Sequence, residues 1–140
     1  MAFLGYPAIT MGGTVRLEHT PANCRAREVL DRVGDKWSLY VILNLGDGTK
    51  RFTELRRSID GISQRMLTVT LKGLERDGIV CRTMYPVMPP RVEYTLTPVG
   101  RTLIDAVSTL FSWAEDHLAD IDAARARYDD ARLEQARPPA

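Results

Sequence analysis

The chain has 140 residues, of which 44% are hydrophobic and 26% are charged, and its formal net charge is +1 at pH 7. That length suits one domain with a single modest core, and no apolar stretch is long enough to span a bilayer, so a membrane partner is not expected. The two cysteines and two histidines lack the clustered spacing of a metal site, and there is no glycine-rich phosphate loop or nucleophile elbow. We therefore expect neither an enzyme nor a bound cofactor or metal.

Residues 1–20 are predicted to form a flexible N-terminal arm. Their apolar side chains are interrupted by Gly5, Pro7, Gly12 and Gly13, and no basic segment precedes them as it would in a secretory signal peptide. A chain with two cysteines and no export signal fits a reducing compartment. We therefore expect a cytoplasmic protein.

Residues 37–45 are apolar almost all round. From periodicity alone this fits either a buried strand or a buried helix. Asp35 as N-cap and Gly46 as terminator favour the helix. Trp37 is interpreted as a core residue, with a place in a ligand pocket as the alternative.

The next predicted helix is short. Phe52, Leu55 and Ile59 recur at i, i+3 and i+7, which is the spacing of one apolar stripe on a helix. Gly61 then supplies a turn. These residues predict a short helix followed by a change of direction.

A second helix is predicted to begin at Gln64, because Ser63 is a good N-cap residue, and to end at Gly78. Apolar positions lie on one of its sides and polar positions on the other. The apolar side carries Leu67, Leu71 and Leu74. The polar side carries Arg65, Thr68, Lys72 and Glu75. In helix-turn-helix proteins the N-terminal end of such a helix contacts bases, and here that end is formed by Gln64 and Arg65.

Two β-rich runs, residues 79–85 and 91–96, follow this helix and predict a hairpin. Apolar and polar residues alternate in the second run, as in a strand with one buried face. Three prolines stiffen the connection between the runs. Arg82 and Arg91 are the charges of this hairpin that we expect to reach a phosphate backbone.

Helix, turn, helix and hairpin in this order predict a winged helix-turn-helix, a mainly α fold with a small β-hairpin wing. Residues 50–101 carry ten Lys or Arg and five acidic residues, whereas residues 102–135 carry three arginines and eight acidic residues. A basic middle and an acidic end fit a protein that places one surface on a polyanion and another elsewhere. Double-stranded DNA is therefore the predicted partner. The candidate DNA-binding residues are Ser63, Gln64, Arg65, Thr68, Lys72, Arg51, Arg82 and Arg91.

Residues 98–121 are predicted to form one long helix, with Pro98 at its first position. Its apolar residues recur at spacings of four and three, and at ~1.5 Å per residue it would be roughly 35 Å long. One small domain does not easily cover that length, so we predict that N- and C-terminal helices pair in a homodimer. The predicted interface residues are Leu103, Val107, Leu110, Phe111, Ala114, His117 and Leu118. Residues 21–122 would then be the DNA-binding and dimerisation domain, and residues 123–140 a polar C-terminal tail.

Six blocks of the sequence resemble the HxlR family of bacterial transcription regulators, which are winged-helix proteins related in architecture to the MarR group. The resemblance starts at Cys24 and ends near Leu118. The blocks are GDKW (34–37), RFTEL (51–55), GISQRMLT (61–68), LERDGIV (74–80), PPRVEYTLTPVG (89–100) and Trp-x-x-x-His (113–117). The resemblance implies a homodimeric repressor on a roughly palindromic operator, with the helix from Gln64 in the major groove and the wing beside it.

Cys24 is predicted to be a redox sensor. It lies near the start of the first helix, with Asn23 as candidate N-cap and Arg25 and Arg27 close by. Helix N-termini and neighbouring cations both stabilise a thiolate. The resemblance implies the same role, because the matching cysteine of many HxlR-type regulators senses oxidants or electrophiles. The alternative is a small apolar residue near the dimer interface, and Cys81 is interpreted as a strand residue of the wing.

Two other functions remain open at this point. A small lipophilic or aromatic ligand, held between the long helix and the DNA-binding core, would switch the regulator in place of thiol chemistry. Alternatively, the winged helix would be a protein-interaction module whose basic face meets an acidic partner. The second function predicts little affinity for DNA.

Overall fold

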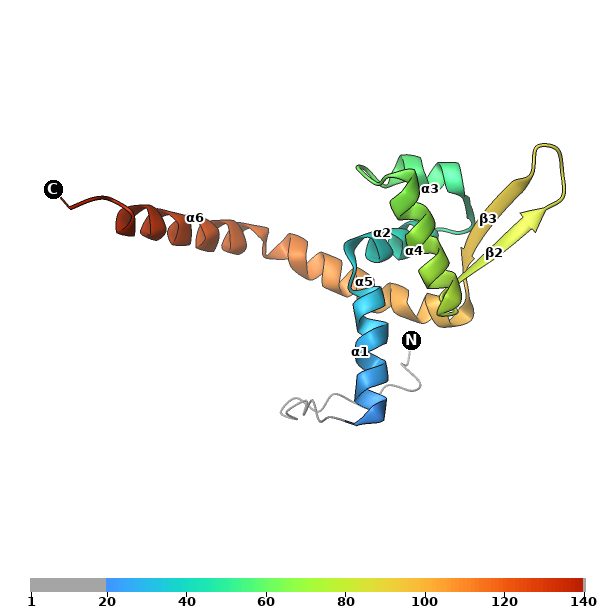
Figure 1. Ribbon diagram of the computed structural model, residues 1–140, viewed down its shortest axis with the longest axis horizontal. Coiled ribbons are helices and arrows are strands. Elements are labelled where there is room, and N and C mark those ends of the chain that lie inside the picture. The colour runs from blue at the N-terminus through green and yellow to red at the C-terminus, as the bar shows by residue number, and fades with distance from the viewer. Residues whose placement is uncertain (1–19, 140) are drawn as a thin grey trace.

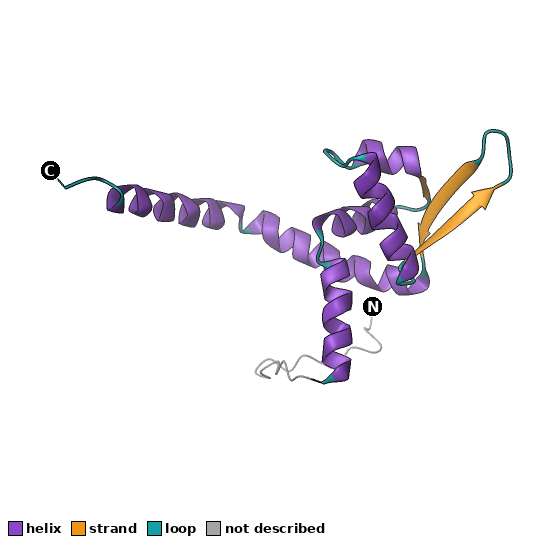
Figure 2. Cartoon of the chain, viewed as in Figure 1, coloured by secondary structure: helices purple, strands orange, loops and turns teal. Residues whose placement is uncertain are grey.

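The computed structural model describes residues 20–139, which form a helical body with a small antiparallel sheet at one side of it (Figure 1). The elements are α1 (Pro21–Val33), α2 (Lys36–Leu45), β1 (Lys50–Arg51), α3 (Phe52–Ser58), α4 (Gln64–Arg76), β2 (Val80–Tyr85), β3 (Arg91–Leu96), α5 (Pro98–Asp116) and α6 (Leu118–Gln135). Figure 2 shows the β2–β3 hairpin projecting from the helical body. The predicted mainly α fold with a β-hairpin wing is confirmed, whereas the predicted N-terminal arm lies outside the described residues apart from Thr20.

The core is built around α2. The Asp35 carboxylate accepts a hydrogen bond from the Ser38 N–H (3.3 Å), and the helix ends at Gly46, as predicted. Its residues Val41, Ile42 and Leu45 are completely buried. Trp37 is half-buried and packs against the same core, which agrees with its interpretation as a core residue.

The apolar stripe of α3 reaches beyond the helix itself. Leu55 is buried within α3, while Ile59 has left the helix with an extended backbone (φ −102°, ψ 97°) and is still buried. Gly61 makes the turn that follows, at a φ of 80° that residues with side chains rarely adopt. The predicted helix is therefore one residue shorter, but its apolar residues enter the core as expected.

α4 has the predicted boundaries and the predicted buried side. The Ser63 hydroxyl accepts a hydrogen bond from the Met66 N–H (3.1 Å), which caps the helix. Gly78 follows the helix at a φ of 73°. The N–H groups of Gly78 and Ile79 donate to the Glu75 and Leu74 carbonyls, which satisfies two of the last helical acceptors. The buried side consists of Leu67, Leu71 and Leu74.

The sheet has the strand order β1–β3–β2, with all pairs antiparallel. In the wing the register runs from Val80 opposite Leu96 to Tyr85 opposite Arg91. β1 was not predicted from sequence, because a strand of two residues is too short to show alternation. It places Arg51 opposite Glu93 at the base of the wing.

The predicted single helix over residues 98–121 is wrong, because α5 ends at Asp116 and α6 begins at Leu118. His117 separates the two helices. Its ring stacks on Trp113 with 4.7 Å between centroids, and its Nδ1 lies 2.7 Å from the Trp113 carbonyl oxygen. The backbone of His117 has left the helical conformation (φ −108°, ψ 6°), and this ends α5. The segment predicted as a polar tail is helical as far as Gln135 and is exposed.

α1 begins earlier than the sequence indicated. Thr20 Oγ1 accepts a hydrogen bond from the Asn23 N–H (3.1 Å), so Thr20 is the cap and the prediction of Asn23 is wrong. The reason is Pro21, which suits the first helical position because its missing N–H is not needed there. No residue of α1 is buried, and Val29 and Leu30 are exposed.

The apolar stripe of α5 is divided between the core and solvent. Val107 is buried, and Leu103 and Ile104 pack against the same core. Val107, one of the predicted dimer-interface residues, is thus already covered by its own protomer. The exposed apolar residues on α5 and at the start of α6 include Leu110, Phe111, Trp113 and Leu118.

We predict that Leu71→Ala lowers the free energy of unfolding by about 2–5 kcal/mol, because it leaves a cavity in the core. Urea unfolding followed by circular dichroism measures this change. Val69→Ala is the matched control in the same helix: the Val69 side chain is 53% exposed. The control should change the unfolding free energy by less than about 0.5 kcal/mol. Equal losses in both variants would contradict the orientation of α4.

Candidate nucleic-acid interface

The outer face of α4 is a continuous strip of exposed side chains. Burial of the leucine side turns Arg65, Val69 and Lys72 toward solvent at intervals of four and three residues. Arg76 continues this face one turn further, with a side chain that is 82% exposed. We call these four residues the α4 strip. It presents three cations and one aliphatic side chain on a single helix face.

Two hydroxyl residues among the predicted DNA contacts already have partners within α4. Ser63 accepts the capping hydrogen bond from the Met66 N–H. Thr68 Oγ1 donates a hydrogen bond to the Gln64 carbonyl oxygen (2.8 Å). Both residues lie beside the α4 strip, but their hydroxyl groups contribute to the structure of the helix.

The two wing arginines differ in how firmly they are held. Arg82 is exposed, and none of the ion pairs among residues 20–139 involves it. Arg91 Nε lies 3.3 Å from Glu93 Oε1, and its guanidinium lies 4.7 Å from the centre of the Tyr85 ring. That Nε makes no hydrogen bond of good geometry, so Arg91 is held by charge and stacking. Arg82 is the freer of the two.

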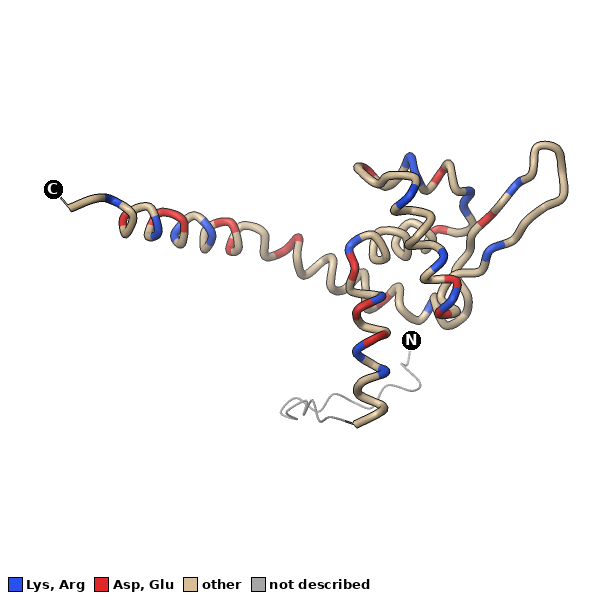
Figure 3. The backbone as a smooth tube through the Cα atoms, in the orientation of Figure 1, with Lys and Arg blue, Asp and Glu red and all other residues tan. Residues whose placement is uncertain are grey.

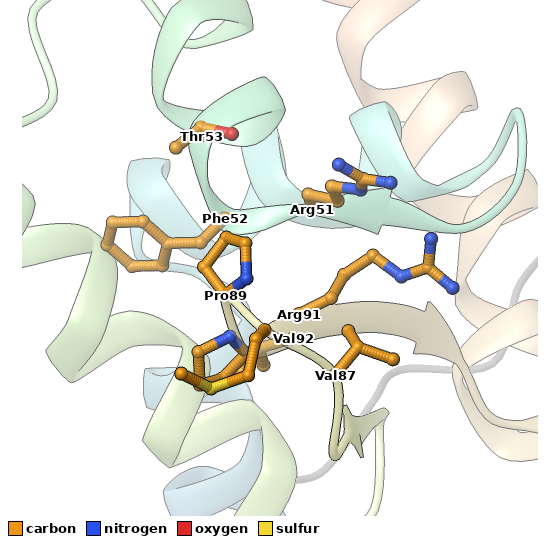
Figure 4. Close-up of a pocket in the computed structure, with 9 residues that line it drawn as sticks. Arg51, Phe52, Thr53, Val87, Pro89, Arg91 and Val92 are labelled. Atoms are coloured by element: carbon orange, nitrogen blue, oxygen red, sulfur yellow. The ribbon is translucent and has the colours of Figure 1, made fainter.

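A pocket of about 470 Å³ lies between the wing loop and the start of α3 (Figure 4). Arg51 and Arg91 extend their guanidinium groups away from the Phe52 and Pro89 side of this pocket. Arg51 is opposite Glu93 in the β1–β3 pairing, and Arg91 is two residues from Glu93 on β3. All three side chains therefore share one face of the sheet. The structure brings Arg51 and Arg91 together, and Arg91 is the one that pairs with Glu93.

Charge is distributed unevenly over the molecule. Figure 3 shows Lys and Arg on α3, on α4 and on both strands of the wing, whereas acidic and basic residues alternate along α6. Of the predicted DNA contacts, Arg65 and Lys72 lie on α4, while Arg51, Arg82 and Arg91 lie on the three strands of the adjoining sheet. The strand register places Arg51 and Arg91 on one face of the sheet and Arg82 on the other, opposite Tyr94. Neither α6 nor another helix in the described part of the chain is long and apolar enough to cross a membrane.

Cys24 and Cys81 are both exposed free thiols. Cys24 is the fourth residue of α1, and its N–H donates a hydrogen bond to the Thr20 carbonyl oxygen (3.0 Å). Figure 1 shows this end of α1 pointing away from the core. Cys81 lies on β2 opposite Thr95, as predicted for a strand residue of the wing.

Val69 and Arg76 are absent from the predicted site residues, although both belong to the α4 strip. The sequence prediction identified the outer face of α4 by its polar residues, and an exposed valine does not meet that criterion. The positional signal is nevertheless present, since Val69 follows Arg65 by four residues and precedes Lys72 by three. Spacing would have found these residues where residue type did not.

Comparison with known proteins identifies the family. Residues 32–122 match the HxlR-like helix-turn-helix family. The chain is also 44% identical over 102 residues to YtfH of Escherichia coli K12, an uncharacterised helix-turn-helix transcriptional regulator, and this match covers 73% of the chain and 81% of YtfH. The chain belongs to the HxlR-like helix-turn-helix family. It is therefore a helix-turn-helix protein of the transcriptional regulator class.

Solved structures place redox regulators among the relatives of this HxlR-like chain. The redox regulator HypR in its reduced form is 42% identical, with a TM-score of 0.66 over 71% of this chain and 98% of HypR. The reduced form of the transcriptional regulator YodB from Bacillus subtilis is 36% identical, with a TM-score of 0.59 over 70% of this chain and 93% of YodB. The HxlR-like match begins at Arg32, so Cys24 lies before it.

Proposed function

We propose that this HxlR-like chain is a sequence-specific DNA-binding regulator that binds a palindromic operator as a homodimer and represses transcription in the cytoplasm. The main observation in support of the proposal is the α4 strip, which is exposed because the opposite side of the helix is buried in the core. An α-helix with such a face fits the major groove of B-DNA. The family assignment supports the same function.

Each part of the interface has a different task in this proposal. Gln64 and Arg65, at the start of α4, read base edges, for which paired donors such as a guanidinium are suited. Val69 contacts the methyl group of a thymine, since it is an exposed aliphatic side chain between cations. The phosphate contacts come from Lys72 and Arg76 on α4 and from Arg51, Arg82 and Arg91 at the wing.

We predict that Arg65→Ala and Arg82→Ala weaken DNA binding in different ways. Arg65→Ala should lose roughly 1–3 kcal/mol of discrimination at one position of each half-site, because it removes a base contact. Arg82→Ala should weaken specific and random DNA alike and reduce the salt slope by about one, because it removes a phosphate contact.

Fluorescence anisotropy over a range of salt concentrations measures both effects. The probes are the intergenic DNA upstream of the gene and a scrambled duplex of the same length. Equal effects of Arg65→Ala on both duplexes would remove the base-reading assignment. No preference of the wild-type protein for the upstream duplex over the scrambled one would favour the protein-interaction module.

Homodimerisation is proposed because two surfaces of the protomer lack apolar cover. α1 exposes Val29 and Leu30, and α5 exposes Leu110, Phe111 and Trp113. Contiguous exposed apolar residues commonly mark an interface. Pairing α1 and α5 with their copies would cover these residues and hold two α4 helices at a fixed separation, as required by half-sites about one DNA turn, ~34 Å, apart.

We predict that Leu110→Asp splits the dimer, because it places a charge in the apolar interface, where an unpaired charge is strongly disfavoured. Sedimentation velocity measures the result as a shift from dimer to monomer. Leu133→Asp is the control: Leu133 is also exposed, but it lies near the far end of α6, outside the proposed interface. A Leu110→Asp variant that stays dimeric would place the interface elsewhere.

Cys24 is the proposed switch of DNA binding. Its thiol is exposed on α1, the helix that we place at the dimer interface. Relatives described as redox regulators support this role. Oxidation to a disulfide, with the partner's cysteine or with a small thiol, would shift α1 against the partner and misalign the two α4 helices. Such a modification changes DNA binding only if it favours the misaligned arrangement of the two α4 helices over the aligned one.

We predict that diamide abolishes operator binding by the wild-type protein and by Cys81→Ser, but not by Cys24→Ser. Diamide removes two electrons and two protons from a pair of thiols, which leaves a disulfide and a hydrazine product. Cys81→Ser is the matched control, because Cys81 is also an exposed free thiol. Equal loss in all three proteins would eliminate Cys24 as the sensor, and binding that is indifferent to diamide would favour a small-ligand inducer.

A further inference from the structure

Arg32 connects α1 to the DNA-reading helix α4. It lies in the last turn of α1, and its Nε is 3.0 Å from Asp77 Oδ2 at the end of α4. The Arg32 and Asp77 side chains are 35% and 23% exposed, so the pair is partly shielded from water. The two residues are 45 positions apart in sequence. The ion pair therefore links separate elements of the fold.

Gly73 provides the space for this contact. It is a buried residue of α4, and a Cβ at its position would collide with the guanidinium of Arg32. Glycine is less favourable than alanine inside a helix. The absence of a side chain at Gly73 allows the Arg32 guanidinium to lie directly against the backbone of α4.

Other packing does little to position α1. None of its residues is buried in the protomer, and two of its three large apolar residues, Val29 and Leu30, face solvent. Val33, at its end, packs against the core. The contact of Arg32 with Gly73 and Asp77 thus restrains the orientation of α1 beyond its point of attachment to α2.

We propose that Arg32 is a positioning residue for the recognition helix: by lying over Gly73 and pairing with Asp77, it couples the orientation of α4 to that of α1. The inference rests on the proposed function, because it assigns α4 to the reading of DNA. Cys24 lies on the same helix as Arg32, so Arg32 also forms the path by which a displacement of α1 reaches α4.

The pairing of Arg32 with Asp77 also affects Arg76, the neighbouring residue of the α4 strip. Arg76 Nη1 lies 3.9 Å from Asp77 Oδ1, so two arginines share one carboxylate, each beside a different oxygen. Arg32 is the closer partner and is much less exposed than Arg76. With Arg32 in place, Arg76 remains available on the α4 strip to contact phosphate. Without Arg32, the Asp77 carboxylate is free to draw Arg76 out of this strip.

Four variants test the proposal: Arg32→Gln, Gly73→Ala, their combination, and Arg27→Gln as the control. Arg27 is an exposed cation of the same helix that forms none of the ion pairs in the described chain. We expect Arg32→Gln and Gly73→Ala each to weaken binding to the upstream duplex roughly three- to tenfold, with a smaller change for the scrambled duplex. The double variant should bind no more weakly than Arg32→Gln, since no guanidinium remains to collide with the new methyl group.

Gly73→Ala separates positioning from a simple effect on stability. Helix propensity alone predicts that alanine makes α4 more stable and leaves DNA binding intact. Weaker operator binding by a protein that is folded and at least as stable is therefore the result expected from positioning. Additive losses in the double variant would overturn the inference, as would a loss in Arg27→Gln equal to that in Arg32→Gln.

Hydrogen exchange of the free protein tests the same contact without DNA. Amides of residues 24–33 should exchange faster in Arg32→Gln and in Gly73→Ala than in the wild type or in Arg27→Gln. Unchanged exchange in both variants would overturn the coupling whatever the DNA result. If instead the exchange changes as expected while the wild-type protein does not distinguish the two duplexes, the proposed function fails and the coupling of α1 to α4 stands.

Discussion

The burial of one side of α4 is the constraint on which the rest of the structure depends. Leu67, Leu71 and Leu74 enter a core that is centred on α2, so α4 cannot rotate about its axis without exposing them. Each such side chain contributes roughly 1.5–3 kcal/mol when buried. The polar strip on the opposite side is therefore presented by a rigid helix. A base-reading helix needs that rigidity, because small displacements break paired hydrogen bonds to base edges.

The wing uses charge differently from α4. Cations on the α4 strip point into solvent, whereas Arg91 stacks on Tyr85 and pairs with Glu93, which also lies opposite Arg51. Opposite charges on neighbouring strands stabilise a small sheet that has little core of its own. A phosphate that approached Arg51 and Arg91 would compete with Glu93. If the proposed DNA binding is correct, Arg51 and Arg91 would therefore contribute less to DNA affinity than Arg82, which forms none of the ion pairs among the described residues.

Most helices and strands could be predicted from local sequence patterns, because each of these patterns fits one type of secondary structure. Ser63 and Asp35 mark helix starts, Gly78 marks a helix end, and alternation in β3 marks its buried face. The sequence-based predictions are wrong where the local backbone conformation or a contact distant in sequence decides where a helix ends or how it packs. The backbone of His117 leaves the helical conformation (φ −108°, ψ 6°) within a continuous apolar repeat, and periodicity does not encode such a break. Likewise, the sequence does not show that Gly73 leaves space for the Arg32 guanidinium, because Arg32 is distant in sequence.

The exposed surfaces of α1 and α5 explain how a change at Cys24 could alter DNA binding. α1 has no buried residue in the protomer, so its position depends on Val33, on Arg32 and on whatever covers Val29 and Leu30. In the proposed dimer a partner subunit provides that cover, and a disulfide at Cys24 competes with it. Because the opposite end of α1 touches α4 through Arg32, the two proposed arrangements of α1 would differ in how the α4 helices are placed. Under the proposed function, that difference would let modification of a thiol remote from the α4 strip change the affinity for DNA.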